Sequence, residues 1–380
     1  MKRAAYILLI FVLFISSAAF FFKPAAIFLA KRNLSRVFID SNVFIRGCSI
    51  NPLRSITLLD LEIKNSAAYD FKISRVKIEY GLGQILKGQI AKVYLEGVRI
   101  SINLPAQSIA KFNQYLRLGS SGAFLVQSAE LKNLDLEVNA NDLKMQAKVS
   151  AAADLTKQRV EACDLIIDSL EAQGLKLEGL ALMFNRAGNC AGSLAIKQIK
   201  YDKAHISELQ SRVTFENFTL VLDSLSAGFL DGKFMGSLTA KLDKNAQVKL
   251  ALKFVDLNLE AFIKDFELGE KAQASGRMSG GISLEARGLD IAALKGTFSS
   301  LGSGGMLVVK DKKFLENMAG NSGQSLDMLV ESFKNYRYSI GNIELFLDNG
   351  NLNFNVALDG EAGKRNLNIV VHDFNLKRRK

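Results

Sequence analysis

The sequence has few of the residues from which catalytic and metal sites are built. Two histidines and three cysteines are spread over 380 residues, and no HExxH, GxSxG or P-loop motif occurs. His205 and His372 lie far apart, with no cluster of cysteines or acidic residues at ligand spacing. The sequence therefore gives no positive sign of an enzyme, and we expect no catalytic residue, no cofactor and no metal.

Tryptophan is absent and proline occurs 3 times, whereas phenylalanine occurs 25 times and glycine 29 times. This balance suits long regular elements that are punctuated by glycine. Apolar residues make up 48% of the chain, which is enough for a sizeable core and excludes a disordered protein. A length of 380 residues favours one or two folding units. The formal net charge of +11 is typical of a protein with an anionic partner, such as nucleic acid or anionic lipid, or with no particular partner.

The amino-terminal segment predicts the compartment. Lys2 and Arg3 precede an uncharged run, Ala4–Phe22, that is long enough to cross a bilayer as a helix. Such a basic stub usually stays in the cytoplasm while the rest is translocated. The small residues at Ser17–Ala19 would also suit cleavage of a signal peptide, but the phenylalanines at 20–22 extend the apolar run past that site. We prefer a retained single-pass anchor. In either case the body is exported, which argues against nucleic acid as a partner.

The three cysteines, Cys48, Cys163 and Cys190, show no CxxC spacing. In an oxidising compartment, Cys163 and Cys190 could form a disulfide if their strands were neighbours. The alternative, which we favour, is three small and half-buried thiols.

Alternation of apolar and polar residues with a period of two dominates the body of the chain. Three of its clearest runs are Leu134, Leu136 and Val138; Leu250, Leu252 and Phe254; and Leu352, Phe354 and Val356. Asn349 and Gly350 precede the third run and predict a hairpin, because positive φ is needed in such a turn. Strands that alternate have one wet face and one dry face, which indicates antiparallel meanders and not a doubly wound parallel sheet.

Helical periodicity is confined to short patches. They are 24–38, an amphipathic continuation of the membrane helix; a stretch after Pro105 with Ile109, Phe112 and Leu116 on one face; 259–266; and 326–333. We predict that each patch caps the dry face of the sheet.

A long sheet with a continuous apolar face has to cover that face. A second sheet would give a sandwich, closure would give a barrel, and an open curled sheet would leave a groove for an apolar molecule that is not protein. Periodicity alone does not choose among these. A transmembrane barrel is the weakest option, because the chain has no Trp for an aromatic girdle.

Three stretches resemble a known superfamily. Residues 71–104 contain the pattern I-x-K-V-x-L-x-G-V-x-I and look like the opening of AsmA-like proteins. Residues 274–309, with L-K-G-x-F-x-S-x-G-x-G-G-M-L-V-V, resemble the carboxy-terminal part of the same superfamily. Residues 312–376 are similar to the end of its YdbH-like branch, which is also labelled "dicarboxylate transport".

Among the sandwich, the barrel and the open curled sheet, the resemblance implies the open curled sheet with a groove. The expected fold is mainly β: an N-terminal transmembrane helix, then a long antiparallel meander curled into a hydrophobic β-groove, with a few short helices. The expected parts are an anchor at 1–23, a juxtamembrane helix and first strands at 24–70, the groove at 71–310, and a closing helix and meander at 311–380.

The resemblance also implies a function. AsmA-like proteins are regarded as bridges that are anchored in the inner membrane, extend into the periplasm and carry phospholipids toward the outer membrane. We therefore expect the three alternating runs to line the groove and to contact lipid. The alternative is a scaffold or assembly factor for the envelope that transports nothing; a wide apolar groove does not suit a small solute such as a dicarboxylate.

The far end of the chain suggests further contacts. An open last strand could pair with a second copy or an outer-membrane partner by strand addition. A basic tail follows it, formed by Lys377, Arg378, Arg379 and Lys380. This tail either guards the open edge or contacts an anionic surface such as lipid head groups.

Overall fold

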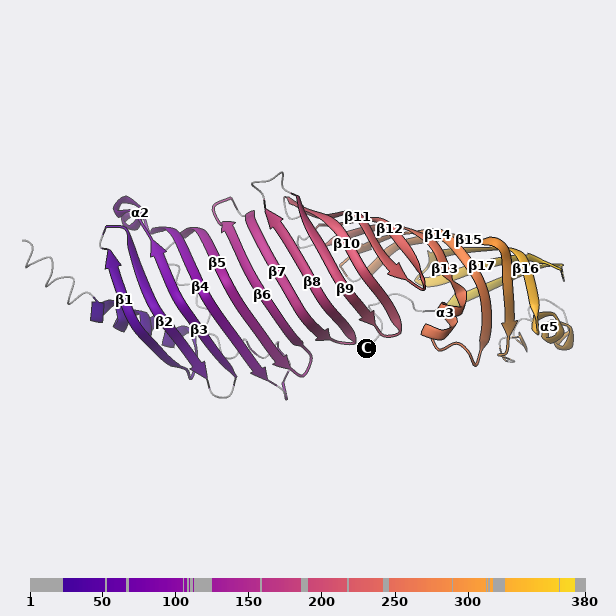
Figure 1. The fold of residues 1–380 in the computed structure, drawn as a ribbon, viewed down its shortest axis with the longest axis horizontal. Coiled ribbons are helices and arrows are strands. Elements are labelled where there is room, and N and C mark those ends of the chain that lie inside the picture. The colour runs from indigo at the N-terminus through magenta and orange to yellow at the C-terminus, as the bar shows by residue number, and fades with distance from the viewer. Residues whose placement is uncertain are drawn as a thin grey trace, which may run out of the picture. The chain divides into compact units, whose positions relative to one another are not determined.

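In the computed structural model, contacts divide the chain into two units, Met1–Asn189 and Cys190–Lys380. The structure describes residues 23–372, except for 52, 66–67, 105, 108, 110–111, 113–124, 158, 186–190, 217–218, 242–245, 289, 312, 314, 317–324 and 362. Strands dominate both units and helices are few and short, as the alternation predicted (Figure 1). The predicted membrane anchor lies outside the described residues. Within the described ones, no helix has the length and apolar character to span a bilayer.

The first unit begins with a helix over residues 23–37 and continues as a sheet. Its elements are β1 (Asn42–Asn51), β2 (Ser55–Asn65), β3 (Tyr69–Glu79), α2 (Leu82–Leu86), β4 (Gln89–Leu104), β5 (Leu125–Ala140), β6 (Lys144–Asp154), β7 (Arg159–Ala172) and β8 (Leu175–Asn185). Each strand pairs with the next, and every pair except β4–β5 is antiparallel. The result is a meander with its turns at two edges.

The second unit is an antiparallel meander throughout its described strands. Its strands are β9 (Ala191–Tyr201), β10 (Ala204–Glu216), β11 (Thr219–Phe229), β12 (Gly232–Lys241), β13 (Gln247–Asn258), β14 (Ala272–Arg287), β15 (Asp290–Val309), β16 (Tyr336–Asp348), β17 (Asn351–Gly360) and β18 (Gly363–Val371). The helices α3 (Leu259–Asp265) and α5 (Leu326–Phe333) interrupt it. The predicted hairpin is confirmed: Asn349 and Gly350 join β16 to β17 with φ of 48° and 79°.

The pairing of β4 with β5 departs from the predicted antiparallel meander. These strands run parallel, with Gln89 facing Leu125 and Leu104 facing Ala140. A parallel pair needs a long crossover, and residues 105–124 supply it. Two described residues of this crossover, Ile109 and Phe112, pack against the core of the first unit. The crossover was predicted as a cap on the dry face, and these two residues confirm that; Leu116 lies outside the described residues.

Bulges interrupt the ladders at intervals. In the first unit, Asp60 and Gly97 have positive φ, 50° and 61°, without a change of register, whereas Asn133, with φ of 55°, lies where the register shifts by one residue. In the second unit, Ser224, Asp256 and Gly276 also lie at register shifts, with φ of 55°, 62° and 115°. A bulge bends its strand and increases the local twist. The series therefore gives a physical reason for these long strands to curve.

The core of the first unit lies between the dry face of its sheet and the helix over 23–37. Ile27, Ala30 and Leu34 of this helix pack against a cluster whose buried members include Leu61, Ile63, Ile102 and Val138. The patch predicted at 24–38 is thus a helix that caps the sheet. In the second unit, α5 plays the same part, because Phe333 is fully buried beside Tyr336, with ring centroids 5.9 Å apart.

Candidate functional site

The register of the second unit joins alternating residues of different strands into apolar rows. One row is Leu252, Ile282, Gly296, Leu345, Phe354 and Ile369, from β13 to β18. The next is Phe254, Gly280, Phe298, Ile343, Val356 and Leu367. Facing residues of paired strands share one face of a sheet. The predicted residues Leu252 and Phe254 therefore lie on the same face as Phe354 and Val356.

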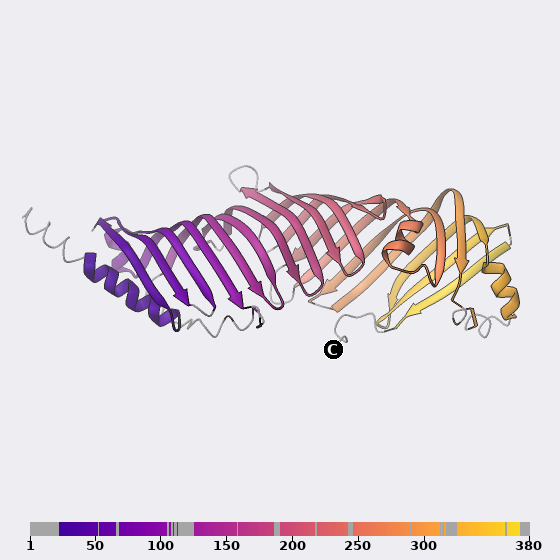
Figure 2. The ribbon, with the colours of Figure 1, turned by 60° about the horizontal axis from the view of Figure 1, so that its bottom comes forward.

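Helix α3 lies against this face (Figure 2). It starts at Asn258, whose side chain accepts a hydrogen bond of 2.9 Å from the Glu260 amide. This N-cap satisfies one of the amides that the first turn leaves unpaired. After the helix, the Leu268 amide donates to the Ile263 carbonyl at 2.8 Å, and the chain returns into β14. The patch predicted at 259–266 is thus a short helix, and three of its side chains, Leu259, Phe262 and Ile263, face a cavity.

The cavity between α3 and the sheet has a volume of about 480 Å³. Besides the three α3 residues, it is lined by Leu268, Lys271, Ala272, Ala274, Met278, Leu307, Val309, Asp311, Tyr338, Gly341, Ile343, Val356, Leu358, Leu367 and Ile369. Charged side chains contribute only at Lys271 and Asp311. The volume falls within the range of about 300–1,000 Å³ that is typical of small-molecule sites. We call this space the α3 cavity.

Small residues open the α3 cavity, and Tyr338 fixes one wall of it. Ala272, Ala274 and Gly341 occupy positions where larger side chains would fill the space. The Tyr338 hydroxyl donates a hydrogen bond of 3.0 Å to the Ser275 carbonyl. Burial raises the pKa of Tyr338, so the phenol stays neutral and keeps its proton for this bond. An apolar wall with its polar atoms satisfied can accept a hydrocarbon chain without leaving a hydrogen bond unmade.

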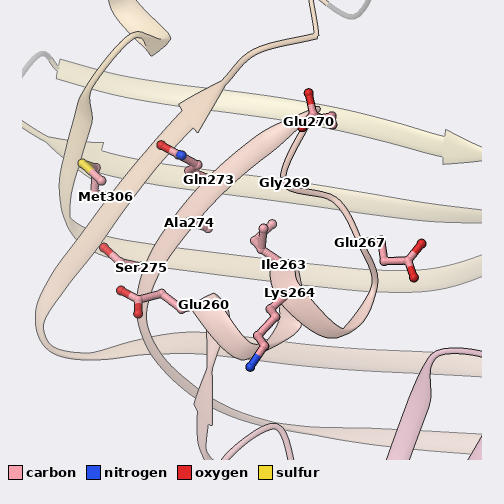
Figure 3. A pocket seen from close by; sticks show the side chains of 10 residues that line it. All are labelled: Glu260, Ile263, Lys264, Glu267, Gly269, Glu270, Gln273, Ala274, Ser275 and Met306. Atoms are coloured by element: carbon pink, nitrogen blue, oxygen red, sulfur yellow. The ribbon is translucent and has the colours of Figure 1, made fainter.

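A second cavity of about 640 Å³ adjoins the first and shares Ile263 and Ala274 with it. Its other lining residues are mostly polar: Glu260, Lys264, Glu267, Gly269, Glu270, Gln273, Ser275 and Met306 (Figure 3). Glu267 also forms an ion pair of 2.5 Å with Lys203, from the turn between β9 and β10. An apolar space and a polar space thus meet at the flank of α3.

The other predicted residues of the second unit lie outside the α3 cavity. Leu252 lines a shallow depression of about 590 Å³ together with Ile282 and Leu345. Phe254 is buried, and its ring lies 5.6 to 6.2 Å from those of Phe298, Phe234 and Phe229. Leu352 and Phe354 pack in a cluster with Leu294 and Leu345. Leu250 is half-buried and faces Leu284.

The predicted residues of the first unit lie under the protein's own cap. Val138 is buried and Leu136 packs beside it, in the cluster that the helix over 23–37 covers. Leu134 is half-buried. The basic tail, Lys377–Lys380, lies outside the described residues. Cys48 and Cys163 have free thiols, whereas Cys190 lies outside the described residues.

The fold and the cavity define a class: a mainly β protein with an extended apolar sheet face and a hydrocarbon-sized cavity. Residues 207–369 match the model of the YdbH-like family, described as "Intermembrane phospholipid transport protein YdbH". The predicted resemblance to this family is confirmed over these residues, which include every lining residue of the α3 cavity. No curated protein matched the chain, and no solved structure did either.

The alternating pattern pointed to only part of this site. It identified Val356 as a groove residue, whereas the apolar residues at helical spacing in 259–266 were predicted only to cap the dry face. It missed Ala272, Ala274 and Gly341, whose contribution is the space that they leave. The sequence does hold a signal for these residues: they are small although the alternation predicts large apolar residues at their positions.

Proposed function

We propose that this chain moves phospholipids between the two membranes of a cell envelope, with their acyl chains against the dry face of the sheet. The observation that carries the proposal is the α3 cavity, an apolar space within the segment that matches the YdbH-like family. Each buried methylene group of an acyl chain contributes about 0.8 kcal/mol relative to water. An acyl chain in this cavity would therefore be held without any charged partner.

The arrangement also provides for the head group and for movement. A head group next to the α3 cavity would lie in the polar cavity, where Glu260, Lys264 and Glu270 supply charges of both signs and keep it hydrated. The apolar rows continue from β13 to β18, so a chain that slides along the sheet exchanges one apolar contact for a similar one. We propose that the curved sheet of the second unit forms a groove for this movement, with the six predicted residues of β13 and β17 along its wall.

Two further parts of the proposal concern location and partners. The uncharged run Ala4–Phe22 would anchor the chain in the inner membrane, with its bulk in the periplasm. The last described strand, β18, pairs with β17. Three of its apolar side chains are exposed: Ile369, Val370 and Val371. A second copy or an outer-membrane partner could add a strand there.

Mass spectrometry of the organic extract of the purified full-length chain tests the proposal. We expect phospholipid in a fixed ratio to protein in this extract, and we expect a distinguishable synthetic lipid to replace it after reconstitution into nanodiscs, because a groove that moves lipid also exchanges it. A scaffold that transports nothing would yield no more phospholipid than an unrelated protein with a single membrane-spanning helix. That result would contradict the proposed function.

A further inference from the structure

One edge of the sheet in the first unit carries an unusual number of exposed aliphatic side chains. They are Leu53 in the β1–β2 turn, Ile85 and Leu86 in α2, Leu125 at the start of β5 and Leu155 in the β6–β7 turn. Leu86 is 88% exposed, Leu53 62%, Leu125 61% and Leu155 45%. We call these five residues the leucine edge.

Hydrogen bonds tie the loops of the leucine edge to one another. The Tyr80 amide donates to the Arg54 carbonyl at 2.9 Å, and the Leu125 amide donates to the Gly88 carbonyl at 2.8 Å. The Gln84 side chain of α2 donates to that of Gln127 at 3.2 Å. The Gln127 carbonyl in turn accepts from the Leu155 amide at 2.9 Å. The loops that carry the exposed side chains are therefore joined by hydrogen bonds and do not move independently of one another.

The parallel pair is what places Leu125 in this row. In an antiparallel continuation, β5 would start at the opposite edge, where β4 ends. Because β5 runs parallel to β4, it starts beside Gln89, next to α2. From the β1–β2 turn to the β6–β7 turn there are about five strand spacings of about 4.8 Å each, so the leucine edge extends over roughly 24 Å.

The opposite edge of the same strands is different. Its described turn and loop residues lie at 39–41, 68, 106–107, 109, 112, 141–143 and 173–174, and no large hydrophobic side chain among them is exposed. Ala68 and the adjacent Tyr69 are buried there. A general tolerance of exposed leucine in this protein would affect both edges alike, so the asymmetry points to a contact at one of them.

Basic residues accompany the apolar side chains. Arg54 follows Leu53, Lys87 follows Leu86, and both are exposed. The acidic residues nearby are in ion pairs: Glu79 with Lys77 at 2.6 Å, and Asp154 with Lys157 at 3.5 Å. The leucine edge therefore presents apolar side chains together with a net positive charge.

We propose that the leucine edge inserts its side chains into the interfacial region of a phospholipid bilayer that contains anionic lipid. Separate aliphatic tips beside basic residues suit a fluid surface, where each tip is solvated independently and each cation meets a phosphate. The helix over 23–37, which follows the uncharged run Ala4–Phe22, packs on strands of this same unit. A bilayer reached by that run would lie near this part of the chain. The inference does not depend on lipid in the α3 cavity.

The absence of tryptophan allows a direct test. We design three single-tryptophan variants of the full-length chain: Leu86→Trp and Leu155→Trp on the leucine edge, and Asn141→Trp in an exposed turn of the opposite edge. Each is reconstituted in vesicles that contain phosphatidylglycerol, with or without brominated acyl chains. We expect blue-shifted emission and loss of fluorescence to the brominated lipid for the first two variants. For Asn141→Trp we expect quenching by aqueous acrylamide and none by brominated lipid.

A leucine edge that contacts water or a protein partner would give another result. Leu86→Trp and Leu155→Trp would then be quenched by acrylamide as strongly as Asn141→Trp and would be insensitive to brominated lipid, which would overturn the proposal. The double substitution of Arg54 and Lys87 by glutamine, in the Leu86→Trp background, tests the cationic part. We expect the double substitution to reduce the quenching by brominated lipid in anionic vesicles to the level seen in vesicles of neutral lipid. If quenching stays stronger in anionic than in neutral vesicles by the same amount as before, the proposed role of Arg54 and Lys87 is contradicted.

Discussion

Replacing Gly304 with alanine is expected to destabilise the second unit by at least about 3 kcal/mol, which is a large effect for one methyl group. Gly304 has a φ of 82°, and a Cβ atom there would overlap the Tyr338 carbonyl oxygen and lie 2.7 Å from the Tyr338 carbonyl carbon. Because these are backbone atoms of the paired strand β16, no side-chain rotation relieves the clash. The ladder between β15 and β16 would have to separate beside the wall that Tyr338 gives to the α3 cavity.

Gly302 is the matched control on the same strand. It also has a positive φ, 63°, but nothing lies within 4 Å of the position of its Cβ. Gly302→Ala should therefore cost only the strain of a left-handed backbone, about 1–2 kcal/mol. Midpoints of urea denaturation for the two variants measure the difference. Equal midpoints would mean that the close approach of β15 and β16 contributes nothing to stability.

Val356→Asp is expected to abolish lipid retention while most of the fold survives. Val356 is half-buried and lines the α3 cavity, where a carboxylate would face hydrocarbon without a hydrogen-bond partner. The variant would release the acyl chain but stay folded, because water can enter the emptied cavity and solvate the new charge. If the space were instead a packed core, the same substitution would unfold the unit.

Ala357→Asp provides the control, since Ala357 is exposed on the opposite face of the same strand. It should keep both its lipid and its melting temperature. The measurement pairs the phospholipid-to-protein ratio with thermal melting. A lipid ratio equal to that of the unchanged protein in Val356→Asp, with the fold intact, would show that the α3 cavity is not the lipid site.

Much of the sheet could be predicted because strand periodicity is a local property. Leu252 and Phe354 share a row although they are 102 positions apart in sequence, since each alternates correctly on its own strand and turns such as Asn349 and Gly350 fix the register. The three caps at 23–37, 259–265 and 326–333 were also predictable, because apolar residues at helical spacing need a face to cover.

The parts that could not be predicted depend on distant contacts or on space. Nothing in the composition of 105–124 distinguishes a parallel crossover from a long hairpin loop. The volume of the α3 cavity follows from the distance between α3 and β16–β18, which no local pattern encodes. The leucine edge consists of loop residues, and these have no periodicity. Single exposed leucines gain meaning only when the fold brings them to one edge.

Site-specific photocrosslinking shows whether lipid occupies the dry face of the sheet next to α3. A photoreactive phenylalanine analogue at Ile343, which is half-buried and lines the α3 cavity, is compared with the same analogue at the exposed neighbour Asn342. After irradiation in cells, we predict phospholipid adducts at position 343 and none at position 342, resolved by mass spectrometry of the intact chain. Adducts at neither position, or equally at both, would contradict the account.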